Sequence, residues 1–92
     1  SRLLAWRCAK TVDMHRPATK ESSALKLYSS ECCVDVLNEA LQIIGGIAYT
    51  KDYPIERFIR DARVYTLFGG TSEMQRMIIS RAIMGQAAKW MK

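Results

Sequence analysis

Apolar residues recur at three- and four-residue intervals along most of the 92-residue chain, the period of amphipathic α-helices. The first such stretch runs from Leu3 to about Arg16 and ends before Pro17, because a proline ring pushes the preceding residue out of the helical region. A longer stretch without proline or glycine follows from Glu21 to Ile44. Its apolar residues occupy more than one face, which is typical of a helix buried among neighbours.

Glycines and a proline divide the second half of the chain. Gly45-Gly46 is expected to end the long helix, with glycine in the left-handed C-cap conformation. The stretch from Ile47 to Tyr53 has no helical period. Pro54, suited to the first position of a helix, opens a third helix that is predicted to continue to about Leu67.

A fourth helix is predicted to begin at Ser72, after Gly69-Gly70. Ser72 and Gln75 have the spacing of a capping box, in which the serine hydroxyl and the glutamine side chain satisfy free amides at a helix start. No alternating strand pattern competes with these helical periods. The sequence therefore predicts an all-α protein, a four-helix bundle formed by residues 1–92.

Charge and apolar run length exclude several classes of protein. The net charge is +5, but acidic residues are interleaved with the basic ones, as in the run from Glu56 to Arg63, which is typical of a solvated helix face. A nucleic-acid surface would need basic residues clustered without acids, so no nucleic-acid partner is expected. The longest apolar runs are a few residues, so no membrane span is expected.

The cysteines do not predict a disulfide framework or a metal site. Cys8, Cys32 and Cys33 are odd in number and two are adjacent, which favours a reduced compartment. With His15 as the single histidine and no Cys-x-x-Cys spacing, the ligands of a structural zinc site are missing, and we predict no metal. His15 is expected at a helix end.

The two glycine pairs allow two interpretations. Both pairs could do no more than end helices. Alternatively, Gly69-Gly70-Thr71-Ser72 could present free backbone amides at a helix N-terminus, where the N–H groups and the helix dipole suit an anionic group. The spacing alone does not decide between a capping role and a binding role.

Four motifs together resemble the C-terminal all-α domain of the acyl-CoA dehydrogenase family. They are Gln42–Gly46, Tyr53–Arg57, Arg60–Tyr65 and Gly70–Arg76, in the family's order and spacing. The resemblance covers essentially the whole chain. It implies that the chain is a segment of a longer polypeptide, with the family's FAD-binding sheet domain and N-terminal helices outside it.

The resemblance also implies a chemistry. Enzymes of this family use FAD to remove an α-hydrogen of an acyl-CoA thioester as a proton and a β-hydrogen as a hydride. The electrons then pass to an electron-transferring flavoprotein. The implied assembly is a homodimer or homotetramer, and the implied compartment is the mitochondrial matrix or the bacterial cytoplasm. The alternative class is a non-enzymatic four-helix interaction module.

Family positions carry over onto particular residues of this chain. Residues matching the segment that contacts the FAD of a neighbouring subunit are Gln42, Ile43, Ile44, Gly45 and Gly46, and those matching a second FAD contact are Thr71, Ser72 and Glu73. Gly70 matches a substrate-contacting position, and Arg81 a position near the CoA moiety.

Gly69 is a departure from part of the family. In short- and medium-chain members, the residue before the Gly-Thr pair is the glutamate that accepts the α-proton, whereas here it is glycine. We therefore predict no catalytic residue within this chain. Members resembling the long-chain and isovaleryl types also lack this glutamate and take their carboxylate from an earlier helix, which lies outside this chain.

Overall fold

The computed structural model describes the backbone of residues 1–90 and the side chains of residues 1–85. Its elements, in order, are α1 (Arg2–Asp13), α2 (Thr19–Ile44), the 3₁₀ turn η1 (Gly46–Tyr49), α3 (Ile55–Arg63), the 3₁₀ turn η2 (Val64–Thr66) and α4 (Ser72–Trp90). The predicted all-α class with four helices is confirmed. Within this described part, no helix is both long enough and apolar enough to cross a bilayer.

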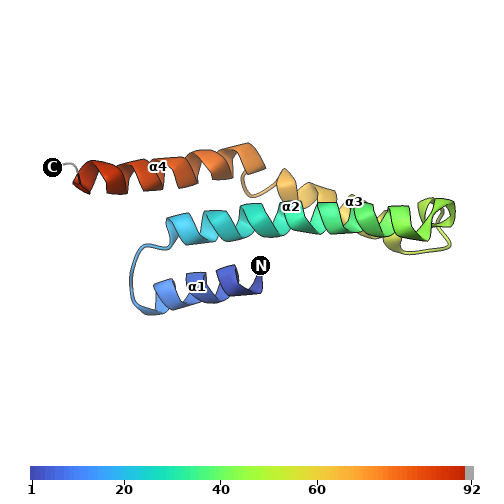
Figure 1. Cartoon of the computed structure of the whole chain (residues 1–92), viewed down its shortest axis with the longest axis horizontal. Helices are drawn as coiled ribbons and strands as arrows, with labels where there is room; N and C mark the ends of the chain where they lie inside the picture. The colour runs from blue at the N-terminus through green and yellow to red at the C-terminus, as the bar shows by residue number, and fades with distance from the viewer. Residues whose placement is uncertain (91–92) are drawn as a thin grey trace.

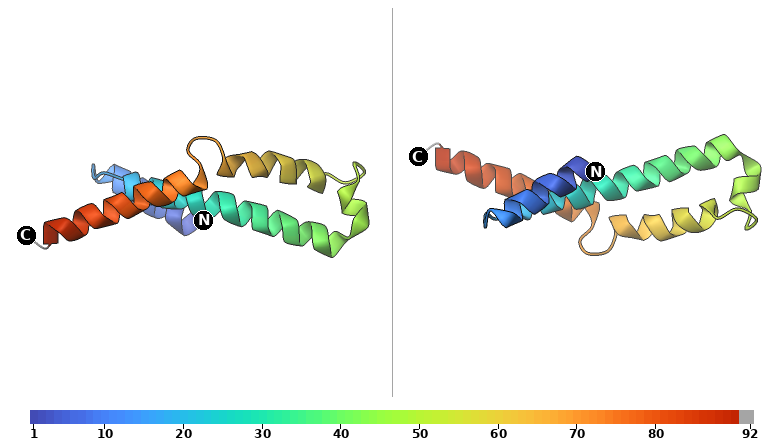
Figure 2. Two further views of the ribbon diagram at one scale, coloured as in Figure 1. Left: turned by 90° about the horizontal axis from the view of Figure 1, so that it is seen from above. Right: turned by 90° about the horizontal axis from the view of Figure 1, so that it is seen from below.

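The long helix α2 is the spine of the structure. Helices α1 and α4 pack on opposite sides of its N-terminal half, and α3 packs along its C-terminal half (Figures 1 and 2). The result is elongated, with extents of 59 × 25 × 21 Å and a radius of gyration of 17.1 Å. A compact domain of this length has a radius of gyration of about 12 to 13 Å.

The elongated arrangement leaves little closed core. Among the described side chains, the buried apolar residues are Ala48, fully buried, and Ala62, 4% exposed. Large apolar side chains stand open on every helix, including Leu3 at 77% and Ile43 at 83% exposure. Apolar patches of this extent on a folded domain mark surfaces that another part of a protein covers.

The helix ends show where the sequence patterns were accurate and where they were not. Helix α2 ends at Ile44, as predicted, but Gly45 has φ +91° and ψ −163°, so it does not adopt the left-handed helical C-cap. That region of φ and ψ is accessible essentially to glycine alone. His15 follows α1 with φ +56°, at a helix end as predicted.

The third helix is shorter than its pattern predicted, and the segment before it is more ordered. Helix α3 ends at Arg63, and the chain then tightens into η2. The Thr66 hydroxyl donates to the Arg63 carbonyl at 2.9 Å and accepts from the Arg63 guanidinium, which holds this tighter turn. The segment from Ile47 contains η1, a turn too short to produce a helical period.

Candidate functional site

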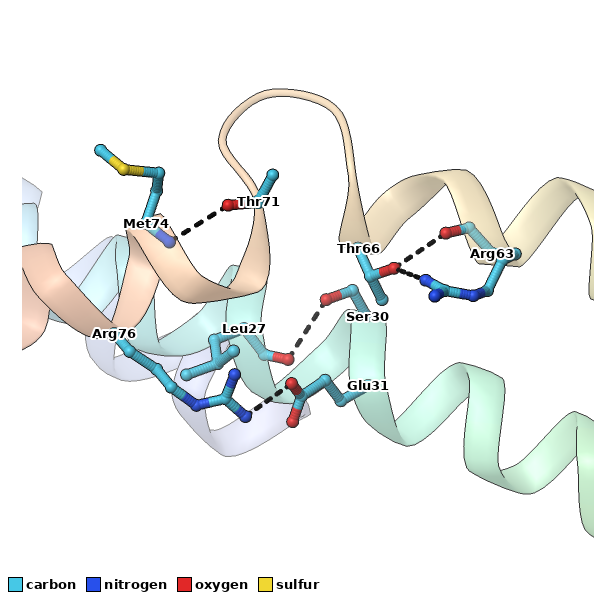
Figure 3. Close-up of polar contacts among 8 residues, drawn as sticks. All are labelled: Leu27, Ser30, Glu31, Arg63, Thr66, Thr71, Met74 and Arg76. Atoms are coloured by element: carbon cyan, nitrogen blue, oxygen red, sulfur yellow. Dashed lines mark hydrogen bonds and ion pairs between the residues drawn. The ribbon is translucent and has the colours of Figure 1, made fainter.

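The loop between η2 and α4 contains two consecutive glycines with positive φ. It arches from Thr66 to Thr71 over the middle of α2 (Figure 3). Gly69 and Gly70 both have positive φ, +61° and +97°, a conformation that side chains disfavour. A Cβ at Gly70 would collide with the Gln75 side-chain amide, whereas Gly69 has open space around it. The positive φ therefore favours glycine at position 70, and a Cβ there would also have to displace the end of the Gln75 side chain.

Helix α4 is capped one residue earlier than the sequence predicted. The Thr71 hydroxyl accepts a hydrogen bond from the Met74 amide at 3.2 Å (Figure 3), and the Thr71 carbonyl accepts from the Gln75 amide at 3.0 Å. The Gln75 side chain does not reach back to the cap; it donates to the Gly69 carbonyl at 3.3 Å. The predicted Ser72–Gln75 capping box is therefore wrong, because Thr71 caps the helix and the loop engages Gln75.

A small polar pocket lies between the start of α4, α2 and η2. It has a volume of about 300 Å³ and is lined by Glu31, Val34, Asp35, Arg63, Thr66, Leu67, Ser72 and Glu73. Ser72 is 5% exposed, and its hydroxyl has no hydrogen-bond partner within the described residues. A buried hydroxyl without a partner is uncommon in folded proteins, so Ser72 is a candidate for contact with a ligand.

The first turns of α4 are tied to α2 by an ion pair. The Arg76 guanidinium donates to the Glu31 carboxylate at 2.7 Å (Figure 3). The two side chains are 54% and 39% exposed, so the pair orients α4 more than it stabilises the fold. Sequence periodicity could not identify this pair, because its members lie on separate helices.

An apolar groove follows the other face of α2. Two adjoining pockets of about 520 and 490 Å³ share Ser29, Cys33 and Tyr65 in their walls. One of them reaches Gly69, so the groove leads to the glycine loop. Cys8, Cys32 and Cys33 are free, and no cluster of three metal-ligating side chains occurs among the residues with described positions.

The two groups of predicted FAD contacts do not meet in this chain. Gln42, Ile43 and Ile44 are exposed at the end of α2, and a Cβ at Gly45 or Gly46 would have open space around it. The pocket beside Ser72 lies level with Asp35 of α2. Seven residues of helix separate Asp35 from Gln42, a rise of about 10 Å.

Arg81 and Gly70 are also apart. Arg81 is exposed on α4, nine residues after Ser72, at an axial distance of about 14 Å from the start of the helix. Gly70 lies in the loop that precedes this helix. The chain therefore does not bring Arg81 and Gly70 to one point, and only an extended ligand could contact both.

The fold and these motifs define an α-helical domain of a known family. A family model described as the acyl-CoA dehydrogenase C-terminal domain matches residues 1–84. The chain belongs to this family.

Similar proteins include enzymes that act on CoA thioesters. The chain is 45% identical over 80 residues to the caffeyl-CoA reductase-Etf complex subunit CarC of Acetobacterium woodii, and 45% identical over 80 residues to the mitochondrial short-chain specific acyl-CoA dehydrogenase of Rattus norvegicus. Each match covers 87% of this chain, and 21% and 19% of the relative. The chain thus spans about a fifth of the length of these relatives.

Solved structures give the same result. A chain from the structure of the electron transferring flavoprotein of Acidaminococcus fermentans superposes with a TM-score of 0.84 at 33% identity, covering 89% of this chain and 22% of that one. The named relatives are of the short-chain and CarC kinds, so the comparisons do not support a specific similarity to the long-chain and isovaleryl types.

Proposed function

We propose that this chain is the C-terminal helical domain of an FAD-dependent enzyme that transfers hydrogen between an acyl-CoA thioester and its α,β-unsaturated form. The observation that carries the proposal is the loop from Gly69 to Glu73, where two glycines with positive φ, a threonine cap and a buried serine hydroxyl without a partner lie together. The match to the acyl-CoA dehydrogenase C-terminal domain over residues 1–84 supports this class of enzyme. Activity of the whole protein is part of the proposal.

The donor set at the start of α4 fits part of an FAD molecule. The Ser72 hydroxyl lacks a partner, and the Thr71 hydroxyl accepts from Met74 and keeps its own hydrogen free to donate. The carboxylates that line the pocket would repel phosphate but accept hydrogen bonds from sugar hydroxyls and amide edges. Thr71, Ser72 and Glu73 would therefore hold the uncharged part of the cofactor.

The end of α2 would contact a different stretch of FAD. Gln42 offers an exposed amide, and the backbone around Gly45 and Gly46 has space for a dinucleotide to approach closely. We assign this contact to the FAD of a neighbouring subunit, as the family resemblance implies. Such a contact between subunits implies a homodimer or homotetramer.

The cofactor supplies the hydride acceptor, and this chain supplies positioning. Gly70 lies where the resemblance places a substrate contact, and Arg81 where it places the CoA moiety. Gly69 carries no side chain that could accept a proton. We therefore expect the proton acceptor to be a carboxylate outside this chain, because general-base catalysis needs a group within hydrogen-bond reach of the α-hydrogen.

The proposed partner for electrons is an electron-transferring flavoprotein, which the name of CarC supports. The proposed compartment is the mitochondrial matrix or the bacterial cytoplasm. The name of the Rattus norvegicus relative describes that enzyme as mitochondrial, and the CarC relative comes from a bacterium, so both compartments are kept in the proposal.

Product analysis with the full-length protein tests the proposal. The purified protein, supplied with a panel of saturated acyl-CoAs and an artificial electron acceptor, is expected to yield products two hydrogens lighter by mass spectrometry. Because CarC is named a reductase, the reverse reaction is measured with enoyl-CoAs and a reducing dye. The free acids are the control. Absence of conversion in both directions across the panel would rule out the proposed activity.

A further inference from the structure

Lys26 contacts the glycine loop, residues 67–71 between η2 and α4, from a distant part of the sequence. It lies on α2, and its ammonium group donates to the Gly70 carbonyl at 2.5 Å, across 44 residues of sequence. No carboxylate pairs with Lys26 among the residues with described side chains. A hydrogen bond from a charged donor is about twice as strong as a neutral one, so this contact ties the loop to α2 although it is exposed.

The surroundings of Lys26 strengthen the contact. The Lys26 side chain, together with Tyr65 and Phe68, lines the apolar pocket that reaches Gly69. The two aromatic rings pack against each other with centroids 5.3 Å apart. The apolar stem of Lys26 lies beside these rings, so the side chain has fewer alternative positions in water. This favours the hydrogen bond from its ammonium group to the Gly70 carbonyl.

Gln75 holds the neighbouring peptide from the opposite helix. Its side-chain amide donates to the Gly69 carbonyl at 3.3 Å, and Gln75 is 6% exposed. The two consecutive carbonyls of Gly69 and Gly70 are thus held from two sides, one by α4 and one by α2.

Because peptide units are planar, the hydrogen bonds to the two carbonyls also orient the N–H groups of the same peptide units. In a trans peptide the N–H points away from the C=O, so fixing the Gly69 carbonyl fixes the Gly70 N–H, and fixing the Gly70 carbonyl fixes the Thr71 N–H. Within the described part of the chain, neither of these N–H groups has an acceptor. They are aimed away from the donors that hold the carbonyls.

We propose that Lys26, supported by Gln75, is a positioning residue that fixes the direction of the Gly70 and Thr71 amides in the substrate-side loop. The proposal rests on the proposed function for its catalytic consequence, but not for its structural one. Lys26 does not touch the reacting atoms; it acts through the Gly70 carbonyl. Loss of the contact should lower turnover, because donors must be correctly aimed when charge develops on a substrate carbonyl.

The test uses the full-length protein with its cofactor and three variants. Lys26→Met removes the donor, Lys26→Arg keeps a charged donor, and Lys20→Met makes the same substitution earlier on α2, where no side-chain hydrogen bond is present in the described structure. Two quantities are measured: hydrogen exchange of residues 68–72, and kcat and KM with the acyl-CoA that the wild type converts best.

Lys26→Met is expected to speed exchange of the loop at least fivefold and to lower kcat about tenfold, with KM changed less than threefold and FAD content retained. Lys26→Arg should recover most of both losses, and Lys20→Met should match the wild type. If Lys26→Met fails to fold, Gln75→Met, nearly equal in shape, is measured in its place, with the same expected loop exchange.

The two failures are distinguishable. A wild type that converts no acyl-CoA, with loop exchange still accelerated by Lys26→Met, would reject the proposed function and keep the positioning contact. Unchanged loop exchange in Lys26→Met, or an unchanged kcat in an active enzyme, would overturn the positioning role. Equal losses in Lys26→Met and Lys26→Arg would also overturn it, because the contact requires only a charged donor.

Discussion

The Thr71 hydroxyl accepts a hydrogen bond from the Met74 amide at 3.2 Å, which makes Thr71 the N-cap of α4. Ser72, the next residue, is consequently free of a capping role, and its hydroxyl is buried without a partner. Two adjacent hydroxyl residues thus have separate roles. One ends the loop and begins the helix, and the other remains available to a ligand.

Ser72→Ala separates ligand binding from folding. Because the hydroxyl has no partner in the chain alone, its removal should leave the free energy of unfolding of the FAD-free full-length protein unchanged or raise it by up to about 1 kcal/mol. FAD affinity should fall about threefold to tenfold, the equivalent of one lost hydrogen bond. Denaturant unfolding and FAD titration measure the two quantities. Ser80→Ala, on the exposed part of α4, is the control. Unchanged FAD affinity in Ser72→Ala would remove this residue from the cofactor site.

Substitutions at Thr71 and Gln42 should weaken FAD retention more than the chemical step. Gln42 is exposed and has no side-chain hydrogen bond in the described structure, so Gln42→Ala should lose cofactor on dilution without loss of stability. Thr71→Val should lose cofactor and also about 1 kcal/mol of stability, because the cap is removed. Thr71→Ser keeps the hydroxyl and should resemble the wild type.

The control for Gln42 is Asn38→Ala, one turn earlier on α2 and also exposed. Flavin content after dilution and gel filtration, compared with kcat per bound flavin, separates binding from chemistry. Full flavin occupancy in both Gln42→Ala and Thr71→Val would show that the family contacts do not apply to these positions.

Gly69 and Gly70 should differ in how well they tolerate substitution by alanine. Gly69→Ala places its Cβ in open space and bears the strain of φ +61°, about 1 kcal/mol, so turnover should fall only modestly. Gly70→Ala also collides with the Gln75 amide and should be the more damaging of the two in both thermal stability and kcat. Adding Gln75→Ala to Gly70→Ala should recover part of the stability.

Neutralising the carboxylate that we propose as the proton acceptor should lower kcat by about 10²–10⁴-fold, the usual contribution of a general base. The comparison with Gly69→Ala is made on straight and branched acyl-CoAs. If Gly69→Ala abolished flavin reduction while every carboxylate preceding this chain proved dispensable, the position of the proton acceptor proposed here would be wrong.

The isolated 92-residue chain is expected not to behave as a stable monomer. Its large exposed apolar surface, from Leu3 to Met84, provides a reason to associate or unfold in water. Sedimentation velocity and thermal unfolding measure this directly. A compact monomer without flavin that unfolds cooperatively would favour the alternative class, a self-sufficient helical interaction module.

Helix content and the helix limits beside glycine could be predicted from the sequence because glycine determines backbone conformation locally. Helices α1 and α3 end at Asp13 and Arg63, earlier than the predicted ends at about Arg16 and Leu67. The helix end at Ile44 and the start of α4 beside Gly70 follow from such local effects. The identity of the cap could not be predicted. Thr71 and Ser72 are both good N-cap residues, and the tertiary contact between Gln75 and the Gly69 carbonyl removes the glutamine from a capping box.

Contacts between segments far apart in the sequence could not be predicted from the pattern of apolar and polar residues. Lys26, Ser30 and Cys33 have helical spacing that places them on one face of α2. Nothing in that spacing indicates a carbonyl 44 residues later as the acceptor of Lys26. The apolar stripes also predicted the helices correctly. They did not predict that the apolar surfaces, such as the one around Ile43, remain exposed in this chain and form no closed core.

An anaerobic titration of the full-length flavoprotein tests the central claim most directly. The flavin absorbance near the visible maximum is followed while a saturated acyl-CoA is added in the absence of oxygen and other acceptors. We expect bleaching that reaches its end point at about one thioester per flavin and does not occur with the free acid. A protein that binds FAD but keeps its full absorbance with every acyl-CoA, and whose dye-reduced flavin is not reoxidised by any enoyl-CoA, would contradict it.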